Sequence, residues 1–151
     1  MKVGCFSSGC YSALKLAGMR TFMKFFRFWL PPAAFAALIF WLSSLMGAQP
    51  APFFHWLKNF DKVIHGTIYA VLGWLTLRAL VVGESMRFPA GAVAAFLICS
   101  AYGASDEWHQ SVVPGRESDP YDWLADSAGA LIAIVSLYRP YTSRAISRVD
   151  G

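Results

Sequence analysis

Four apolar stretches, each near the length of a membrane helix, constrain the fold more than any other feature of the sequence. They run from about Pro32 to Ala48, Lys62 to Val82, Pro89 to Ser105 and Tyr121 to Tyr138. About 20 mainly apolar residues in a helix cross the hydrocarbon core of a bilayer, and about 17 is the lower limit. Because 56% of the 151 residues are hydrophobic and only 15% are charged, the sequence predicts an all-α polytopic membrane protein with a bundle of four transmembrane helices.

One membrane domain accounts for most of the chain. We assign residues 1–28 to a basic cytoplasmic tail or interfacial segment, 29–140 to the four-helix domain and 141–151 to a short basic cytoplasmic tail. The basic and aromatic segment from Met19 to Trp29 is compatible with an interfacial helix, and a disordered tail up to Met19 or a misplaced start codon is an equally open alternative. Since no adequate apolar core precedes Pro31, we expect an uncleaved anchor rather than a signal peptide.

The charged residues are divided unequally between the two ends of the predicted bundle. One end receives the basic residues Lys2, Lys15, Arg20, Lys24, Arg27, Arg78, Arg87, Arg139, Arg144 and Arg148. The other end receives the acidic residues Asp61, Asp106, Glu107, Glu117, Asp119, Asp122 and Asp126. Basic segments close to a membrane span tend to stay in the cytoplasm. We therefore expect both termini in the cytoplasm and the acidic helix ends outside.

Polar residues in three of the spans recur every three or four positions, so each set follows one face of a helix. The sets are Asp61, His65 and Tyr69; Tyr102, Asp106 and His109 or Gln110, if that helix continues past Ser105; and Asp122, Asp126 and Gly129 or Ala130. A charged side chain at the membrane centre costs roughly 2.5–3.5 kcal/mol. Asp126, about one turn inside its span, therefore needs a partner such as Lys62, His65 or Arg116, or a hydrated pocket.

Several kinds of chemistry are compatible with these residues. His65 beside Asp61 can carry protons, bind a metal or form a packing hydrogen bond. Asp106 and Glu107 point about 100° apart on a helix, so only one of them can face that pair. Asp106, His109 and Asp122 with His65 contain the nitrogen and oxygen donors that a divalent cation accepts, although no dedicated metal motif such as HExxH is present. The glycines of a nucleophile elbow are also missing around Ser105 and Ser111, which argues against a serine hydrolase.

The loop before the fourth span contains a turn followed by a cation. Pro114 and Gly115 favour a turn, and the guanidinium of Arg116 can bind a carboxylate or a phosphate with two parallel hydrogen bonds. We favour a clamp across the acidic helices over a hook for a ligand. The nearby aromatic residues Trp108, Tyr121 and Trp123 are typical of a membrane interface, and the run from Phe53 to Phe60 is expected along the same outer surface.

The polar stretches also resemble a known family. "DKVIHGTIYAVLGWL", "DEWHQSVVPGRESDPYDWLADSAGALIA" and the earlier "WLSS" are similar to the VanZ-like family of small bacterial membrane proteins, over about residues 38–137. The family pattern falls on Asp61, Lys62, His65, Tyr69, Asp106, Glu107, Gln110, Pro114, Gly115, Arg116, Asp122, Asp126 and Gly129. Asp126 stands where the family usually has Asn, which adds a potential negative charge. The resemblance implies the bacterial cytoplasmic membrane and a connection with teicoplanin susceptibility.

Two hypotheses about function follow. In the first, a polar pocket on the extracytoplasmic side binds the head of an amphipathic envelope molecule, such as a lipid-linked cell-wall precursor or a lipoglycopeptide. The expected ligand-binding residues are Asp61, Lys62, His65, Tyr69, Asp106, Glu107, Gln110, Arg116, Asp122 and Asp126. In the second, His65, Asp106 and Glu107 are catalytic residues in acid–base or metal-assisted chemistry on a lipid head group.

The remaining features narrow the choice of partners. Ion transport is less favoured, because no charged residue lies in the middle of a span and no helix break is evident there. Cys5, Cys10 and Cys99 form neither a metal-ligand pattern nor a closed set of disulfides. The net charge of +4 comes from residues scattered between apolar segments, which does not indicate nucleic-acid binding. We expect membrane lipids as partners and no cofactor.

Overall fold

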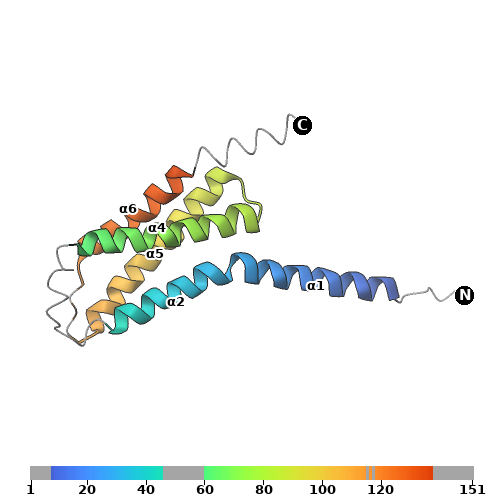
Figure 1. The fold of residues 1–151 in the computed structure, drawn as a ribbon, viewed down its shortest axis with the longest axis horizontal. Coiled ribbons are helices and arrows are strands. Elements are labelled where there is room, and N and C mark those ends of the chain that lie inside the picture. The colour runs from blue at the N-terminus through green and yellow to red at the C-terminus, as the bar shows by residue number, and fades with distance from the viewer. Residues whose placement is uncertain (1–7, 46–59, 115, 117, 138–151) are drawn as a thin grey trace, which may run out of the picture.

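The computed structural model describes residues 8–45, 60–114, 116 and 118–137, and these residues form helices and short connections without a strand. The elements are α1 (Ser8–Phe28), α2 (Leu30–Leu45), α4 (Asp61–Arg78), the π-helix η2 (Ala79–Gly83), α5 (Phe88–Val112) and α6 (Pro120–Ser136). The predicted all-α class is therefore confirmed. Figure 1 shows α4, α5 and α6 packed together, with α2 beside them and α1 extending beyond the other helices.

The local sequence explains where several helices begin. Pro89 lies in the first turn of α5 and Pro120 is the first residue of α6, positions at which the missing N–H of proline removes no helical hydrogen bond. The side chain of Asp119 accepts a hydrogen bond from the backbone N–H of Tyr121 and so caps the N-terminus of α6. At the other end of α4, the last residues adopt the wider π-helical turn η2.

Helices α4 and α6 approach each other very closely. A Cβ atom added at Gly129 would lie 1.9 Å from the backbone oxygen of Gly66, and one added at Gly73 would lie 3.0 Å from Cα of Ala130. Two residues without side chains therefore allow the two backbones to touch, as small residues do between membrane helices. Apolar residues continue this contact, since Leu77 of α4 and Ile134 of α6 share one buried cluster.

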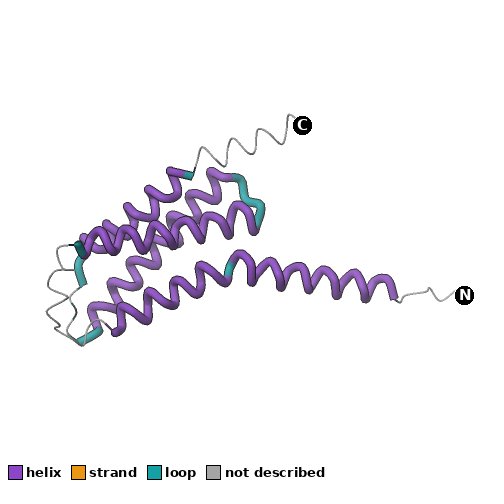
Figure 2. Tube along the Cα trace, viewed as in Figure 1, coloured by secondary structure: helices purple, strands orange, loops and turns teal. Residues whose placement is uncertain are grey.

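The first two helices form one long, bent arm. The axes of Gly18–Phe28 and Leu30–Leu45 differ by 42°, and Figure 2 shows the bend at a short non-helical break. The arm is attached to the turn after η2 through Glu84, which accepts hydrogen bonds from Lys24 and Trp29, each 2.9 Å long. Helix α1 begins at Ser8, so the chain is helical well before Met19, where we expected the interfacial helix to begin.

Helices occur at all four positions predicted to span the membrane, with different lengths. Two segments are long and apolar enough to cross a bilayer, Asp61–Gly83 with 23 residues and Phe88–Val112 with 25, and the bent arm makes a third if it counts as one span. Helix α6, with 17 residues, is at the lower limit. Helix α5 continues seven residues past the predicted end at Ser105, which places Asp106, Glu107 and Gln110 on a regular helix. The run from Phe53 to Phe60 was predicted along the outer surface. Apart from Phe60, it lies outside the described residues.

Candidate functional site

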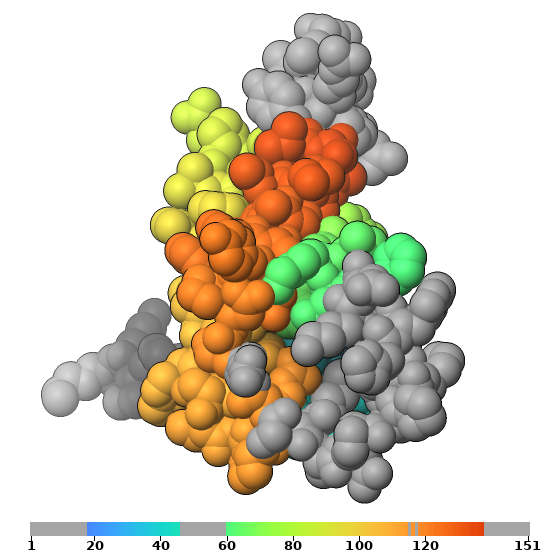
Figure 3. Space-filling view, turned by 90° about the vertical axis from the view of Figure 1, so that its left-hand side faces the viewer, coloured from blue at the N-terminus to red at the C-terminus, as the bar shows by residue number. Residues whose placement is uncertain are grey.

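The predicted polar residues meet at one end of the bundle. Helices α4 and α6 begin there, and α2 and α5 end there, because successive helices alternate in direction. Figure 3 views this end, where the last turns of α5 lie beside the first turns of α6 and α4. Four carboxylic side chains are buried in this polar end: Asp106, Glu107, Asp122 and Asp126, with 3%, 6%, 5% and 0% of the residue surface exposed. Such burial requires hydrogen bonds or counter-charges.

Lys62 is the cation at the mouth of this polar end. Its ammonium group lies 2.5 Å from Oδ2 of Asp119 and also bonds to Oδ1 of Asp122. The Lys62 side chain is 47% exposed, whereas that of Asp122 is 7% exposed. The ion pair therefore extends from the solvent-exposed surface to the buried carboxylates. The hydrogen bond from Lys62, with help from the backbone N–H of Tyr121, lowers the pKa of Asp119 below its ordinary value. Lys62 therefore ties the start of α4 to the start of α6.

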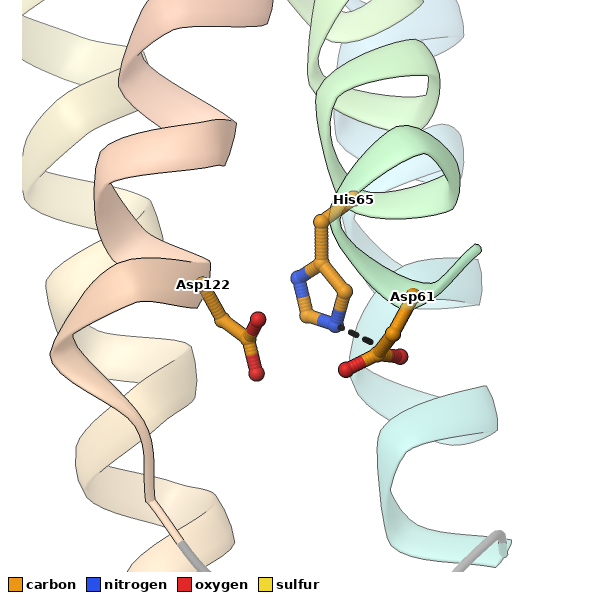
Figure 4. Close-up of side chains that lie close together, drawn as sticks. All are labelled: Asp61, His65 and Asp122. Atoms are coloured by element: carbon orange, nitrogen blue, oxygen red, sulfur yellow. Dashed lines mark ion pairs between the residues drawn. The ribbon is translucent and has the colours of Figure 1, made fainter. Parts of the chain in front are cut away.

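His65 occupies the next turn of α4 and lies among three carboxylates. Its Nδ1 atom is 3.0 Å from Oδ1 of Asp126, and its Nε2 atom is 3.9 Å from Oδ1 of Asp61. Figure 4 shows the imidazole ring between the side chains of Asp61 and Asp122, with the dashed line marking the contact to Asp61. Of the three candidate partners expected for Asp126, His65 is the one that contacts it among the described residues, and this contact crosses from α4 to α6.

Glu107 connects this group to the loop before α6. Its Oε2 atom accepts hydrogen bonds from the backbone N–H of Asp119 at 2.9 Å and from the hydroxyl of Ser118 at 3.3 Å. Among the described residues, its other oxygen, Oε1, has no hydrogen-bond partner, and the same holds for Oδ2 of Asp126 and the hydroxyl of Tyr69. Buried polar atoms are normally bonded, so these three atoms mark a place where a ligand, ion or water can bind.

Asp106 belongs to a separate branch of the site. Its Oδ1 atom accepts a hydrogen bond from Ser43 of α2 at 2.9 Å, and its Oδ2 atom accepts one from Gln110 at 3.0 Å. The side-chain oxygen Oε1 of Gln110 in turn accepts a hydrogen bond from the guanidinium of Arg116. His109 turns away from this branch and lies 3.0 Å from the hydroxyl of Ser44. As the helical geometry predicted, Asp106 and Glu107 face different partners.

Two details differ from the sequence-based interpretation. Among the described residues, Arg116 reaches a carboxylate only indirectly, through Gln110, and Lys62 makes the clamp between helices. Asp106 and His109, which the sequence offered as possible metal donors with His65 and Asp122, hydrogen-bond to Ser43 and Ser44 of α2. Ser43 and Asp119 are absent from the predicted site; the resemblance of "WLSS" and the capping position before Pro120 are the signals that point to them.

The geometry permits two chemical uses. Two groups of metal donors have their ligand atoms within 4.8 Å of one another: His65 with Glu107 and Asp126, and His65 with Asp61 and Asp122. The second use is proton transfer, since an imidazole hydrogen-bonded to a buried carboxylate is a common acid–base arrangement. Both uses centre on His65.

Comparison with known proteins assigns the chain to a family. A model of the VanZ/LLP1 family matches residues 11–141, which cover the described helices from near the start of α1 to the end of α6. The match begins within residues 1–28, so the family region is larger than the four-helix domain we assigned from residue 29. Searches of the curated proteins and of the solved structures gave no significant match. The chain belongs to the VanZ/LLP1 family.

Proposed function

We propose that this chain is a four-span protein of the bacterial cytoplasmic membrane, and that its polar end recognises the head group of an amphipathic envelope molecule. The observation that carries the proposal is a buried polar site at one end of a bundle whose outer surface is apolar. The large apolar residues Val93, Leu97, Leu131, Ile132 and Val135 are all exposed on α5 and α6. Exposed apolar faces of this extent indicate contact with lipid or with another protein.

The two ends of the bundle support the orientation with the polar end outside. Lys24, Arg27 and Arg78 lie together at the opposite end, since Lys24 binds Glu84 and Arg78 donates to the backbone oxygen of Arg27. Clustered basic residues beside membrane helices favour the cytoplasmic side. The short α2 and α6 would then be the first and fourth spans.

Several features of the polar end suit a head group that carries phosphate or carboxylate. Lys62 is half exposed at the mouth, and a ligand anion can take the place of Asp119 on its ammonium group. Trp108 and Tyr121 are 74% and 69% exposed beside it, as expected for aromatic residues at a membrane interface. A lipid-linked cell-wall precursor or a lipoglycopeptide such as teicoplanin combines a polar head with an apolar tail, so one ligand can occupy the polar end and the lipid together.

The lipids that co-purify with the protein test this proposal. We compare the full chain with Lys62→Gln after extraction in mild detergent, using mass spectrometry of bound lipids. Lys24→Gln is the matched control, because it removes an equally exposed lysine paired with a carboxylate at the other end. We expect an envelope lipid on the wild-type protein and on Lys24→Gln, with a clear loss on Lys62→Gln. Equal lipid on all three proteins would contradict recognition at the polar end.

A second function is favoured by the pairing of His65 with Asp126 beside Glu107. This group suits acid–base or metal-assisted chemistry on a lipid head group. Substitution separates the two functions: ligand binding should weaken gradually as carboxylates are removed, whereas a reaction should be abolished by His65→Gln alone. The measurement is turnover of labelled envelope lipids in membranes that contain each variant.

A further inference from the structure

The four buried carboxylates of the polar end are not equally well paired. Asp106 has a partner on each oxygen, from Ser43 and Gln110. Asp122 bonds to the ammonium group of Lys62. Glu107 and Asp126 differ from them, because each has one buried oxygen that no described residue bonds to. Neither forms an ion pair with a described lysine or arginine, so their charges are opposed only by His65.

The two free oxygens lie on facing surfaces of α5 and α6. Oδ2 of Asp126 is directed at α5, since a Cβ atom built at Gly103 would lie 3.2 Å from it. Glu107 is four residues after Gly103 and therefore follows it on the same face of α5. Because Oε2 of Glu107 is bonded to the N–H of Asp119, Oε1 is the oxygen left for another ligand. Both carboxylates are more than nine-tenths buried, so bulk water does not satisfy these oxygens.

The spacing of the donor atoms fits a metal ion. One ligand atom from each of His65, Glu107 and Asp126 lies within 4.8 Å of the other two. Adjacent ligands at 2.0–2.2 Å from a metal are separated by about 3 Å in an octahedral site and by about 3.4 Å in a tetrahedral one, and Nδ1 of His65 lies 3.0 Å from Oδ1 of Asp126. A hydrogen bond has the same length, and the two free oxygens beside this contact supply the further ligand atoms that an ion would use. Small movements of these side chains bring all three to one centre.

We propose that His65, Glu107 and Asp126 bind one divalent transition-metal ion, of the Mn²⁺ or Zn²⁺ class. Two carboxylates balance the charge of such an ion, and a neutral imidazole completes a donor set of one nitrogen and two or more oxygens. Imidazole favours transition metals over Mg²⁺ and Ca²⁺, which prefer oxygen ligands alone. This site goes beyond the proposed recognition of an envelope ligand, because it requires only the protein and the ion.

The alternative donor group fits an ion less well. It shares His65 but uses Asp61, whose side chain is 46% exposed, and Asp122, which already bonds to Lys62. A cation there would have to displace the lysine. Asp61 therefore provides a control: it lies beside the same imidazole and is excluded from the proposed site.

Manganese binding tests the proposal directly. The full chain is purified in mild detergent, stripped with EDTA and titrated with Mn²⁺, and bound ion is followed by electron paramagnetic resonance. We expect one Mn²⁺ per chain, displaced by Zn²⁺, with a pulsed spectrum that shows coupling to an imidazole nitrogen. Glu107→Gln and Asp126→Asn should weaken binding at least about 100-fold, because loss of even an outer-shell partner costs 10–100-fold. Asp61→Asn should bind as the wild-type protein does.

Three results would overturn the site: no saturable binding by the wild-type protein, equal binding by Glu107→Gln, or loss of binding only in Asp61→Asn. If the variants fail to fold, the wild-type spectrum still decides, because bound Mn²⁺ without nitrogen coupling contradicts ligation by His65. Envelope lipid on a protein that binds no metal would leave the recognition proposal standing and remove this one. Metal binding by a protein that carries no envelope lipid would support this site and remove the recognition proposal.

Discussion

Each end of the helix bundle contains a lysine paired with a carboxylate, but only one of these pairs leads into the interior. At the basic end, Lys24 and Glu84 are 42% and 41% exposed, and Trp29 adds a hydrogen bond from the surface. At the polar end, Lys62 bonds to Asp122, which is 7% exposed and lies beside His65. Exposed pairs contribute little because water competes for both partners. The difference indicates that the pair at the basic end attaches α1 to the turn after η2. The buried ionisable groups of the polar end lower stability, which indicates that they have a functional role.

The largest expected effect comes from separating the helices that form the polar end. Gly129→Ala places a Cβ atom 1.9 Å from the backbone oxygen of Gly66, and no side-chain rotation relieves a clash with backbone. We expect a loss of about 3 kcal/mol or more in the free energy of unfolding, measured by denaturant titration in detergent. Gly18→Ala in α1 is the control, because a Cβ atom there meets nothing within 4 Å. Equal stability of the two variants would rule out the close crossing of α4 and α6.

A smaller effect is expected from removing one partner at each end. His65→Ala leaves the fully buried Asp126 without its only described hydrogen-bond partner. Because the carboxyl group can take up a proton, we expect the cost of an unsatisfied buried polar group, about 1–3 kcal/mol, rather than that of a buried unpaired charge. Lys24→Ala removes an exposed partner of Glu84 and should leave stability close to that of the wild-type protein. Thermal unfolding of both variants in the same detergent makes the comparison. A larger loss in Lys24→Ala would reverse the assignment of the two ends.

The smallest effect is a dependence on pH at the basic end. Hydrogen bonds from Lys24 and Trp29 lower the pKa of Glu84 below its ordinary value. A lowered pKa in the folded state means that the stabilisation is present above the pKa of the unfolded state and is lost as pH falls through the folded value. The stability difference between the wild-type protein and Glu84→Gln should therefore shrink on acidification below about pH 4.5, the ordinary pKa of a glutamate. A difference that grows on acidification would contradict this pairing.

Helical periodicity made the core of the site predictable. Asp61, His65 and Asp126 have the spacing that places them on polar stripes of two helices. The need to pair a carboxylate inside a span made His65 one of three candidate partners of Asp126, beside Lys62 and Arg116. Neighbouring residues on a helix point about 100° apart, and this angle predicted that Glu107 and Asp106 would have different partners. These predictions succeeded because they depend on local geometry and on charge, both of which can be read from sequence.

The rest of the site depends on how the chain turns between helices. The conformation before α6 brings Asp119 to Lys62 and directs Arg116 to Gln110, and no periodic pattern describes such a loop. Ser43 carries no charge and lies in an apolar helix, so its bond to Asp106 has no compositional signal. The contact between Gly66 and Gly129 also could not be assigned, since small residues permit close packing without specifying the partner helix.

In the proposed orientation, the polar end faces the outside and the basic end faces the cytoplasm. Ser118 and Ser85 are exposed at these two ends, and each can be changed to Cys in a chain whose three native cysteines have been replaced. A maleimide that cannot cross the membrane is then applied to intact cells and to lysed cells. We predict that Ser118→Cys reacts on intact cells and that Ser85→Cys reacts only after lysis. Reaction of Ser85→Cys on intact cells, with Ser118→Cys protected until lysis, would contradict the account.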